Sequence, residues 1–146
     1  AAVPKETCIR IDANQGWTPK EAVRILNGMQ ERGLDLEFVE QPVKAHDFEG
    51  LKYVTERSYV PVLADESVFS PQDALTIMQM GAADLVNIKL MKCGGLYNAL
   101  RCRGVRRGVH DRLYAGSQDQ RECRRASGLR KADHHPRGSG RPRAVQ

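Results

Sequence analysis

A regular alternation of short β-rich runs and helical patterns constrains the fold of this chain more than any other feature. The β-rich runs are Cys8–Ala13, Leu36–Glu40, Val60–Asp65 and Asp84–Leu90. Each run is followed by apolar residues at helical spacing, so that one strand and its helix together occupy about 25 residues. Strand followed by helix, four times, predicts an α/β fold with a parallel sheet and right-handed crossovers.

Capping residues mark where the helices begin. Thr18 is followed by Pro19, with an acidic residue two positions later, which matches an N-cap, a proline in the first turn and a capping-box acid. The same signal recurs at Ser70 and Pro71. A weaker helical pattern lies between residues 47 and 57. The capping residues therefore predict helix starts at the same point of successive strand–helix units.

The architecture that this repeat favours is a (β/α) TIM-type barrel. A complete barrel needs ~250 residues, so four strand–helix units make about half of one. An open doubly wound sheet is the second possibility, but no GxGxxG turn follows the first predicted strand. We therefore expect a partial barrel over residues 1–100.

Charged residues lie at the ends of all four predicted strands. They are Asp12, Glu40, Asp65 and Lys89, separated by 28, 25 and 24 residues. Each separation is one strand–helix unit, so the four side chains should emerge at the carboxyl edge of neighbouring strands. Barrel enzymes build their active sites at this edge.

Three converging carboxylates repel one another unless a cation lies among them, and oxygen ligands of this kind suit Mg²⁺. A lysine beside such a cation is biased toward its neutral amine and could act as a base. The cation would stabilise an enolate formed on a carboxylate substrate. The residues alone leave a second interpretation open, in which each acid caps a helix or is a solvated surface charge.

Four longer stretches around these residues resemble the enolase superfamily, in the mandelate racemase and muconate-lactonizing enzyme group. They are IRIDANQGWTPKEAV (9–23), EFVEQPV (37–43), VLADESVFSP (62–71) and ADLVNIKLMKCGG (83–95). Within this group the sequence is most similar to dipeptide epimerases of the L-Ala-D/L-Glu epimerase type. The order and spacing of the four stretches fit as well as their residues.

The resemblance implies a role for each strand-end residue. Asp12, Glu40 and Asp65 match the three Mg²⁺ ligands of the family. Lys89 matches the lysine that acts as acid and base on one face of the active site. Lys92 is the rival lysine, although we expect it to lie past the strand end.

Three neighbouring residues have weaker assignments. Glu66 and Asn14 are expected to support the metal ligands. Cys93 lies where a small residue would suffice, so we expect it to pack in the core. None of the three is expected to take part in the chemistry directly.

The resemblance also implies a reaction, which is epimerisation of a dipeptide such as Ala-Glu by 1,1-proton transfer through a metal-stabilised enolate. A second lysine, in a KxK motif before the strand that carries Asp12, returns the proton. The chain starts at Ala1, so we expect it to lack that lysine and the N-terminal capping domain, and to be inactive alone. Alternatives within the superfamily are a muconate cycloisomerase, an o-succinylbenzoate synthase and an N-acylamino acid racemase. The full-length family is expected to form homo-oligomers.

The chain changes character after residue 100. Residues 1–100 carry a net charge of −4, whereas residues 101–146 carry +9 and include 12 arginines. The second segment has too few aliphatic residues to build a core. We expect a disordered basic tail produced by a frameshift, because codons for residues 109–115 permit Cys-Met-Ile-Gly-Cys-Met-Leu in the shifted frame. That string resembles a family strand.

A basic tail that binds nucleic acid is the rival interpretation for this second segment. Aromatic residues do not alternate with its basic ones, and it contains no recognised module, so we expect no specific nucleic-acid partner. His110, His134, His135 and Cys123 do not match the spacing of a zinc finger. Charge alone would give only non-specific attraction to polyanions.

Composition indicates the cellular setting that we expect. The chain has no run of ~18 apolar residues, so no membrane-spanning helix is predicted. The N-terminus shows no signal peptide, and the four cysteines form no CxxC pair. We therefore expect a cytoplasmic location with free thiols.

Overall fold

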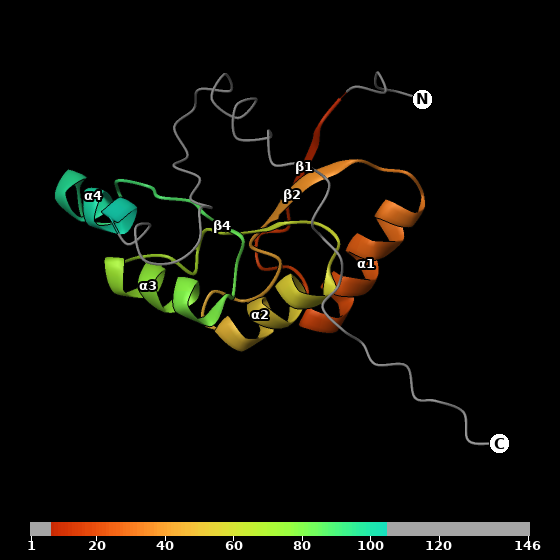
Figure 1. The fold of residues 1–146 in the computed structure, drawn as a ribbon, viewed down its shortest axis with the longest axis horizontal. Coiled ribbons are helices and arrows are strands. Elements are labelled where there is room, and N and C mark those ends of the chain that lie inside the picture. Colours follow the sequence, from red (N-terminus) through yellow and green to blue (C-terminus); the bar gives the residue numbers. More distant parts are fainter. Residues whose placement is uncertain (1–6, 105–146) are drawn as a thin grey trace.

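Four strand–helix units make up the computed structural model, which describes residues 7–104 (Figure 1). Strands and helices alternate strictly along the chain, as the sequence predicts. In order they are β1 (Ile9–Asp12), α1 (Pro19–Glu31), β2 (Leu36–Glu40), α2 (Phe48–Arg57), β3 (Val62–Ala64), α3 (Pro71–Met80), β4 (Leu85–Val86) and α4 (Leu96–Gly104). Residues 1–6 and 105–146 lie outside the described part, and so do all but the first four residues of the segment predicted to be a frameshifted, disordered tail.

The four strands form one parallel sheet in the order β1-β2-β3-β4. Helices α1, α2 and α3 follow one another in the same order along one side of the sheet (Figure 1). A doubly wound sheet would reverse its strand order at a switch point, whereas a barrel keeps chain order. The described residues therefore form a parallel α/β sheet in chain order, which is consistent with part of a (β/α) barrel.

The helices begin where the sequence predicts. The Thr18 side chain accepts from the N3 backbone of α1 in a complete capping box. The Ser70 hydroxyl accepts from the backbone N–H of Asp73 at 3.1 Å in α3. Asp47 caps α2, because its Oδ1 accepts from the N–H of Gly50 at 2.7 Å. Each cap satisfies a backbone donor that the first helical turn leaves without a partner.

A continuous apolar core lies between the sheet and its helices. Its fully buried members include Leu26 of α1, Leu51 of α2 and Ile77 of α3, which pack with Val39 and Val62 of the sheet. Burial of a side chain of this size contributes about 1.5–3 kcal/mol each. The core fixes the strands in register and so determines where their carboxyl ends lie.

Strand β4 is shorter than the predicted run Asp84–Leu90, since it covers only Leu85–Val86. The backbone N–H of Asn87 still donates to the carbonyl of Ala64 at 2.8 Å. Beyond that bond the chain turns through residues 90–94. Among the described residues β4 has a partner strand on one side only.

Helix α4 crosses the predicted boundary between residues 100 and 101. It continues to Gly104, and Cys102 is fully buried in the core. The first four residues of the predicted tail are therefore helical instead. Cys93 is also buried, which confirms its predicted packing role, and Cys8, Cys93 and Cys102 are free thiols. Within residues 7–104, no helix is both long and apolar enough to cross a membrane.

Candidate active site

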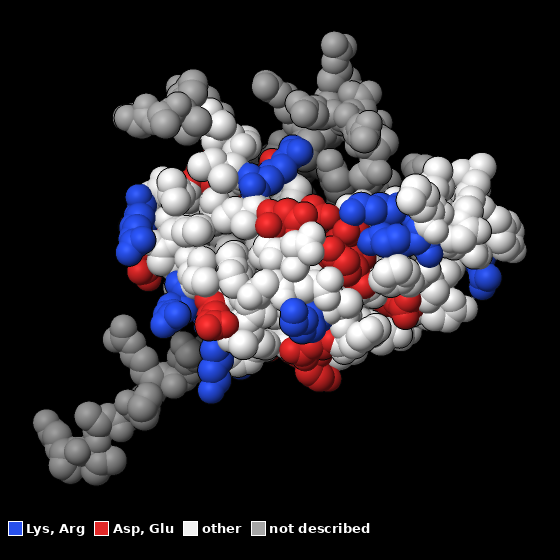
Figure 2. Space-filling view, turned by 180° about the vertical axis from the view of Figure 1, so that it is seen from behind, with Lys and Arg blue, Asp and Glu red and all other residues white. Residues whose placement is uncertain are grey.

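The carboxyl ends of the strands bring the four predicted site residues to one edge of the sheet. Asp12 and Glu40 are direct register partners on β1 and β2. Glu40 in turn pairs with Leu63 on β3, two residues before Asp65. On one face of the molecule, acidic side chains gather near the middle with basic side chains beside them (Figure 2).

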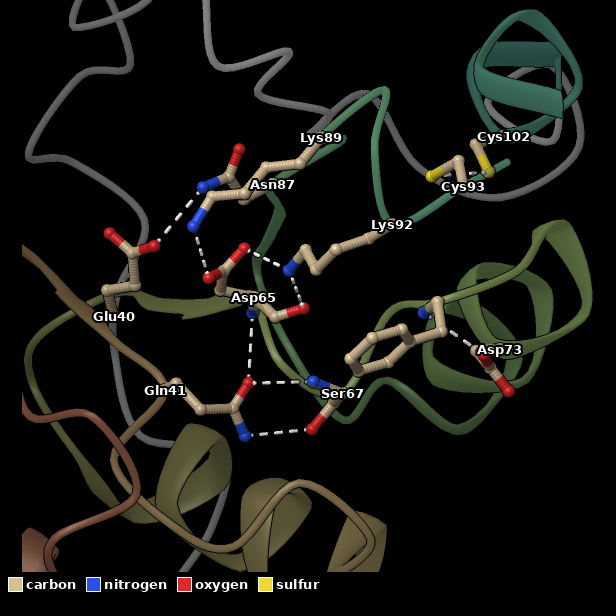
Figure 3. Close-up of polar contacts among 11 residues, drawn as sticks. Glu40, Gln41, Asp65, Ser67, Asp73, Asn87, Lys89, Lys92, Cys93 and Cys102 are labelled. Carbon is tan, nitrogen blue, oxygen red and sulfur yellow. Dashed lines mark hydrogen bonds and ion pairs between the residues drawn. The ribbon is translucent and has the colours of Figure 1, made fainter. Parts of the chain in front are cut away.

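Asp65 is the most enclosed of the three carboxylates, because its side chain is only 4% exposed. Its Oδ2 accepts from Nζ of Lys89 at 2.6 Å. Nζ of Lys92 contacts Oδ1 of Asp65 and also donates to the Asp65 backbone carbonyl at 2.7 Å. Figure 3 shows the two lysines approaching this carboxylate together. A buried carboxylate is therefore neutralised by two ammonium groups.

Glu40 lies next to Asp65 and feels the charge of both other carboxylates. Its Oε1 accepts from Nδ2 of Asn87 at 3.1 Å (Figure 3). Burial raises the pKa of Glu40 above its usual value, and the charges of Asp65 and Asp12 raise it further, against the lowering effect of the Asn87 bond. The electrostatic repulsion expected among the three strand-end acids is therefore present.

Asp12 is the exposed member of the set. Its Oδ1 accepts from the backbone N–H of Asn14 at 2.9 Å, and Asn14 adopts a left-handed φ of 44°. Asn14 thus supports Asp12 through its backbone. Of the other predicted supporting residue, Glu66, the buried Oε2 has no hydrogen-bond partner within the described residues.

Within residues 7–104, no three His, Cys, Asp or Glu side chains lie close enough together to form a ready metal cluster. The donor set nevertheless fits Mg²⁺, which prefers carboxylate oxygens. Burial, and then the charges of Asp65 and Asp12, raise the pKa of Glu40. Glu66 Oε2 and Asn87 Oδ1 are further buried oxygens without a donor in the described part of the chain. A cation at this edge would offset that excess of negative charge and acceptor atoms.

The surroundings of Lys89 in the described part of the chain favour its charged form. The hydrogen bond to Asp65 raises the pKa of Lys89, and this effect outweighs the lowering effect of burial. The charges of Glu40 and Glu66 act in the same direction. With Asp65 as its strongest partner, Lys89 is therefore held as an ammonium in this structure, and its neutral form beside a bound cation stays a prediction.

Two further residues contribute to the site beyond the sequence predictions. Lys92, which we expected to lie past the strand end, reaches Asp65 because the chain turns back between residues 90 and 94. Gln41 is fully buried directly after Glu40 and bonds across to β3. The sequence signal that could have identified Gln41 is its position directly after the strand-end acid Glu40, within EQP.

Fold and site together define a class of protein, namely α/β proteins that carry acidic residues and a lysine at the ends of consecutive parallel strands. The chain belongs to the Enolase C-terminal domain-like family, whose family model matches residues 1–126. The resemblance inferred from the sequence is thereby confirmed. That match extends past the described residues into the segment predicted to be frameshifted.

Relatives of this chain are named as epimerases and racemases, which are isomerases, so the family is enzymatic. The L-Ala-D/L-Glu epimerase of Clostridium acetobutylicum is 61% identical over 100 residues, covering 68% of this chain and 28% of the relative. The substrate-liganded L-Ala-D/L-Glu epimerase from Bacillus subtilis matches with a TM-score of 0.69 and 49% identity, over 70% of this chain and 28% of that one.

A third relative was solved with ligands bound. The dipeptide epimerase from Enterococcus faecalis, complexed with Mg and the dipeptide L-Leu-L-Tyr, has a TM-score of 0.70 and 42% identity. The match covers 81% of this chain and 33% of that structure. The chain therefore spans about a third or less of these relatives.

Proposed function

We propose that this chain carries the metal-binding part, and one of the proton-transfer residues, of a Mg²⁺-dependent dipeptide epimerase. The observation that carries the proposal is the Lys89–Asp65 pair at 2.6 Å, at the ends of neighbouring strands and beside Glu40. The identity to dipeptide epimerases supports the assignment. We infer a small dipeptide such as Ala-Glu as the substrate class.

Asp12, Glu40 and Asp65 would hold the metal. Mg²⁺, when bound, supplies positive charge that offsets the negative charge developing on the substrate carboxylate. Asp65 and Glu40 lie in the more enclosed part of the edge, where charges interact more strongly than in water. Asp12 would be the metal ligand on the solvent-exposed side of the site.

Lys89 is the acid/base group of the proposal. Its side chain is 49% exposed, so Nζ can turn from Asp65 toward a substrate carbon. As an ammonium it is prepared to donate a proton, and after donation it becomes the base for the reverse transfer. Lys92 is 16% exposed and is also tied to the Asp65 backbone, which suits a fixed counter-ion better.

Epimerisation at one carbon needs an acid and a base on opposite faces of the substrate. Among the described residues, the lysines that contact a strand-end carboxylate are Lys89 and Lys92, and both follow β4. We therefore propose that the 146-residue chain alone does not turn over. The muconate cycloisomerase, o-succinylbenzoate synthase and N-acylamino acid racemase alternatives would use the same carboxylates with another substrate.

Calorimetric titration of the full chain with MgCl₂ tests the metal site. The wild-type chain should bind Mg²⁺, and Asp65→Asn should weaken binding strongly because a carboxylate ligand is replaced by an amide. Glu56→Gln is the matched control, since Glu56 is an exposed carboxylate on α2 that pairs with Arg57. Equal affinities for wild type and Asp65→Asn would contradict the assignment.

Proton NMR of Ala-Glu in D₂O with Mg²⁺ tests the prediction of inactivity. We expect no deuterium at the α-carbon in the presence of the chain. Deuterium incorporation that disappears in Lys89→Met would overturn the proposal that the chain is inactive alone. The same result would leave the role of Lys89 supported.

A further inference from the structure

The side-chain amide of Gln41 links the ends of β2 and β3. Gln41 is fully buried, and its Oε1 accepts from the backbone N–H groups of Asp65 at 2.9 Å and Ser67 at 3.1 Å. Its Nε2 donates to Oγ of Ser67 at 2.8 Å and to the carbonyl of Val43 at 3.0 Å. Both donor hydrogens and both acceptor positions of the amide are therefore used. Figure 3 shows the contacts with Asp65 and Ser67.

The backbone of Gln41 is held equally firmly. Its N–H donates to the carbonyl of Leu63 at 2.9 Å, and its carbonyl accepts from the N–H of Gln15 at 2.8 Å. Gln41 has a φ of 36°, in the left-handed region that residues with a side chain rarely adopt. Such a conformation persists where the surrounding structure over-determines it, and it often accompanies functional sites. At Gln41, the hydrogen bonds of the side chain and the backbone hold the residue in this conformation.

We propose that Gln41 is a positioning residue that sets the placement of the Asp65 carboxylate relative to Glu40. Glu40 is the last residue of β2 and immediately precedes Gln41, whereas Asp65 lies one strand away and is held through its own backbone amide. One buried side chain thus links two acids on neighbouring strands. The inference rests on the proposed function, in which both acids bind Mg²⁺, and it adds a group that fixes their spacing without touching the metal.

A purely structural role would give a different pattern of effects, and Ser67 provides the matched control. The Ser67 hydroxyl accepts from Gln41 and donates to the carbonyl of Ala45 at 2.8 Å. Ser67→Ala removes these bonds but leaves Oε1 of Gln41 on the Asp65 amide. Gln41→Met keeps the length of the side chain and removes every hydrogen bond of the amide. Both changes lower stability, but only the second releases Asp65.

The experiment combines Mg²⁺ titration with NMR-detected amide hydrogen exchange on the full chain. We expect Gln41→Met to weaken Mg²⁺ affinity by about 10-fold to 100-fold, the range seen when a group supporting a metal ligand is lost. It should also speed exchange of the Asp65 amide. Ser67→Ala should retain the wild-type affinity and keep the Asp65 amide protected.

The outcomes separate this inference from the proposed function. If Asp65→Asn loses Mg²⁺ while Gln41→Met binds it as wild type does, the positioning role is overturned and the metal site stands. If the wild-type chain binds no Mg²⁺, the proposed metal site and this inference both fail. Wild-type exchange remains decisive if Gln41→Met does not fold, because an unprotected Asp65 amide contradicts the bond from which the inference starts.

Discussion

The Nζ of Lys89 lies 2.6 Å from Oδ2 of Asp65, although 24 residues separate them in the chain. One residue lies at the end of β3 and the other follows β4, so the pair joins two successive strand–helix units. The distance fits a charge-assisted hydrogen bond. Because Asp65 is buried and Lys89 is half-exposed, the acid depends on its lysine partners more than they depend on it.

Removing Lys92 should destabilise the fold more than removing Lys89. Lys92 is the less exposed lysine and bonds both the side chain and the backbone of Asp65. Lys92→Met should lower the free energy of unfolding by about 1.5–3 kcal/mol, the range for a lost hydrogen bond to a charged group. Lys89→Met should cost less, because solvent screens its exposed ammonium. Urea unfolding at neutral pH measures both, and a larger loss in Lys89→Met would contradict this ranking.

Two helical glycines should respond oppositely to alanine. At Gly50 a Cβ would lie 2.1 Å from Oδ2 of Asp47, whose side chain caps α2, so Gly50→Ala should destabilise the chain by about 1–2 kcal/mol. At Gly28 in α1 a Cβ would meet nothing within 4 Å, so Gly28→Ala should stabilise the chain by about 0.5–1 kcal/mol. Thermal unfolding of the two variants compares them directly. Shifts of the same sign would show that the packing around Asp47 does not decide the outcome.

Alkaline pH should weaken the fold through Cys102. Burial, and then the neighbouring Cys93 thiol at 3.9 Å, raises the pKa of Cys102 from 9.0 to about 11. The folded state therefore keeps this thiol neutral where the unfolded chain ionises. Its contribution to stability is present in full below pH 9.0 and is lost as the pH rises through about 11.

The difference in melting temperature between wild type and Cys102→Ala isolates this contribution between pH 8 and 11. We expect the variant to lose less stability than wild type over that range. Cys8→Ala is the control, since Cys8 is exposed, and it should track wild type. Parallel curves for wild type and Cys102→Ala would refute the prediction.

Asn27 should stabilise the chain by joining α1 to the end of α2. Its Nδ2 donates to the carbonyl of Arg57 at 3.1 Å, and its Oδ1 accepts from the N–H of Tyr59 at 3.1 Å. Asn27→Ala should cost about 1–2 kcal/mol, because two backbone groups lose their partner. Gln30→Ala, also on α1, should change stability little by comparison. Urea unfolding of Asn27→Ala and Gln30→Ala, measured side by side, compares the two losses of stability.

Local signals explain why the sequence predicts most of the fold. Thr18 and Ser70 mark helix starts through bonds to residues only a few positions away, and both helix starts appear in the structure. The early end of β4 was not visible in the local pattern, because the β-rich run continues to Leu90 while the strand ends at Val86.

The site shows the same difference between what sequence spacing predicts and what long-range contacts set. The 28, 25 and 24 residue spacings bring Asp12, Glu40, Asp65 and Lys89 to one edge, because each spacing spans a complete strand–helix unit. Spacing does not say which atoms meet at that edge. The structure places Lys92 on Asp65 and Asn87 on Glu40, through a turn whose path depends on long-range packing.

The sequence by itself determined the repeating unit, the helix caps and the identity of the strand-end residues, because these depend on periodicity and on hydrogen bonds between near neighbours. Only the tertiary structure decided that Lys89 is paired as an ammonium, that Lys92 shares Asp65, and that Gln41 spans two strands. Those features depend on burial and on distances between segments 24 to 27 residues apart, which the compact fold alone sets.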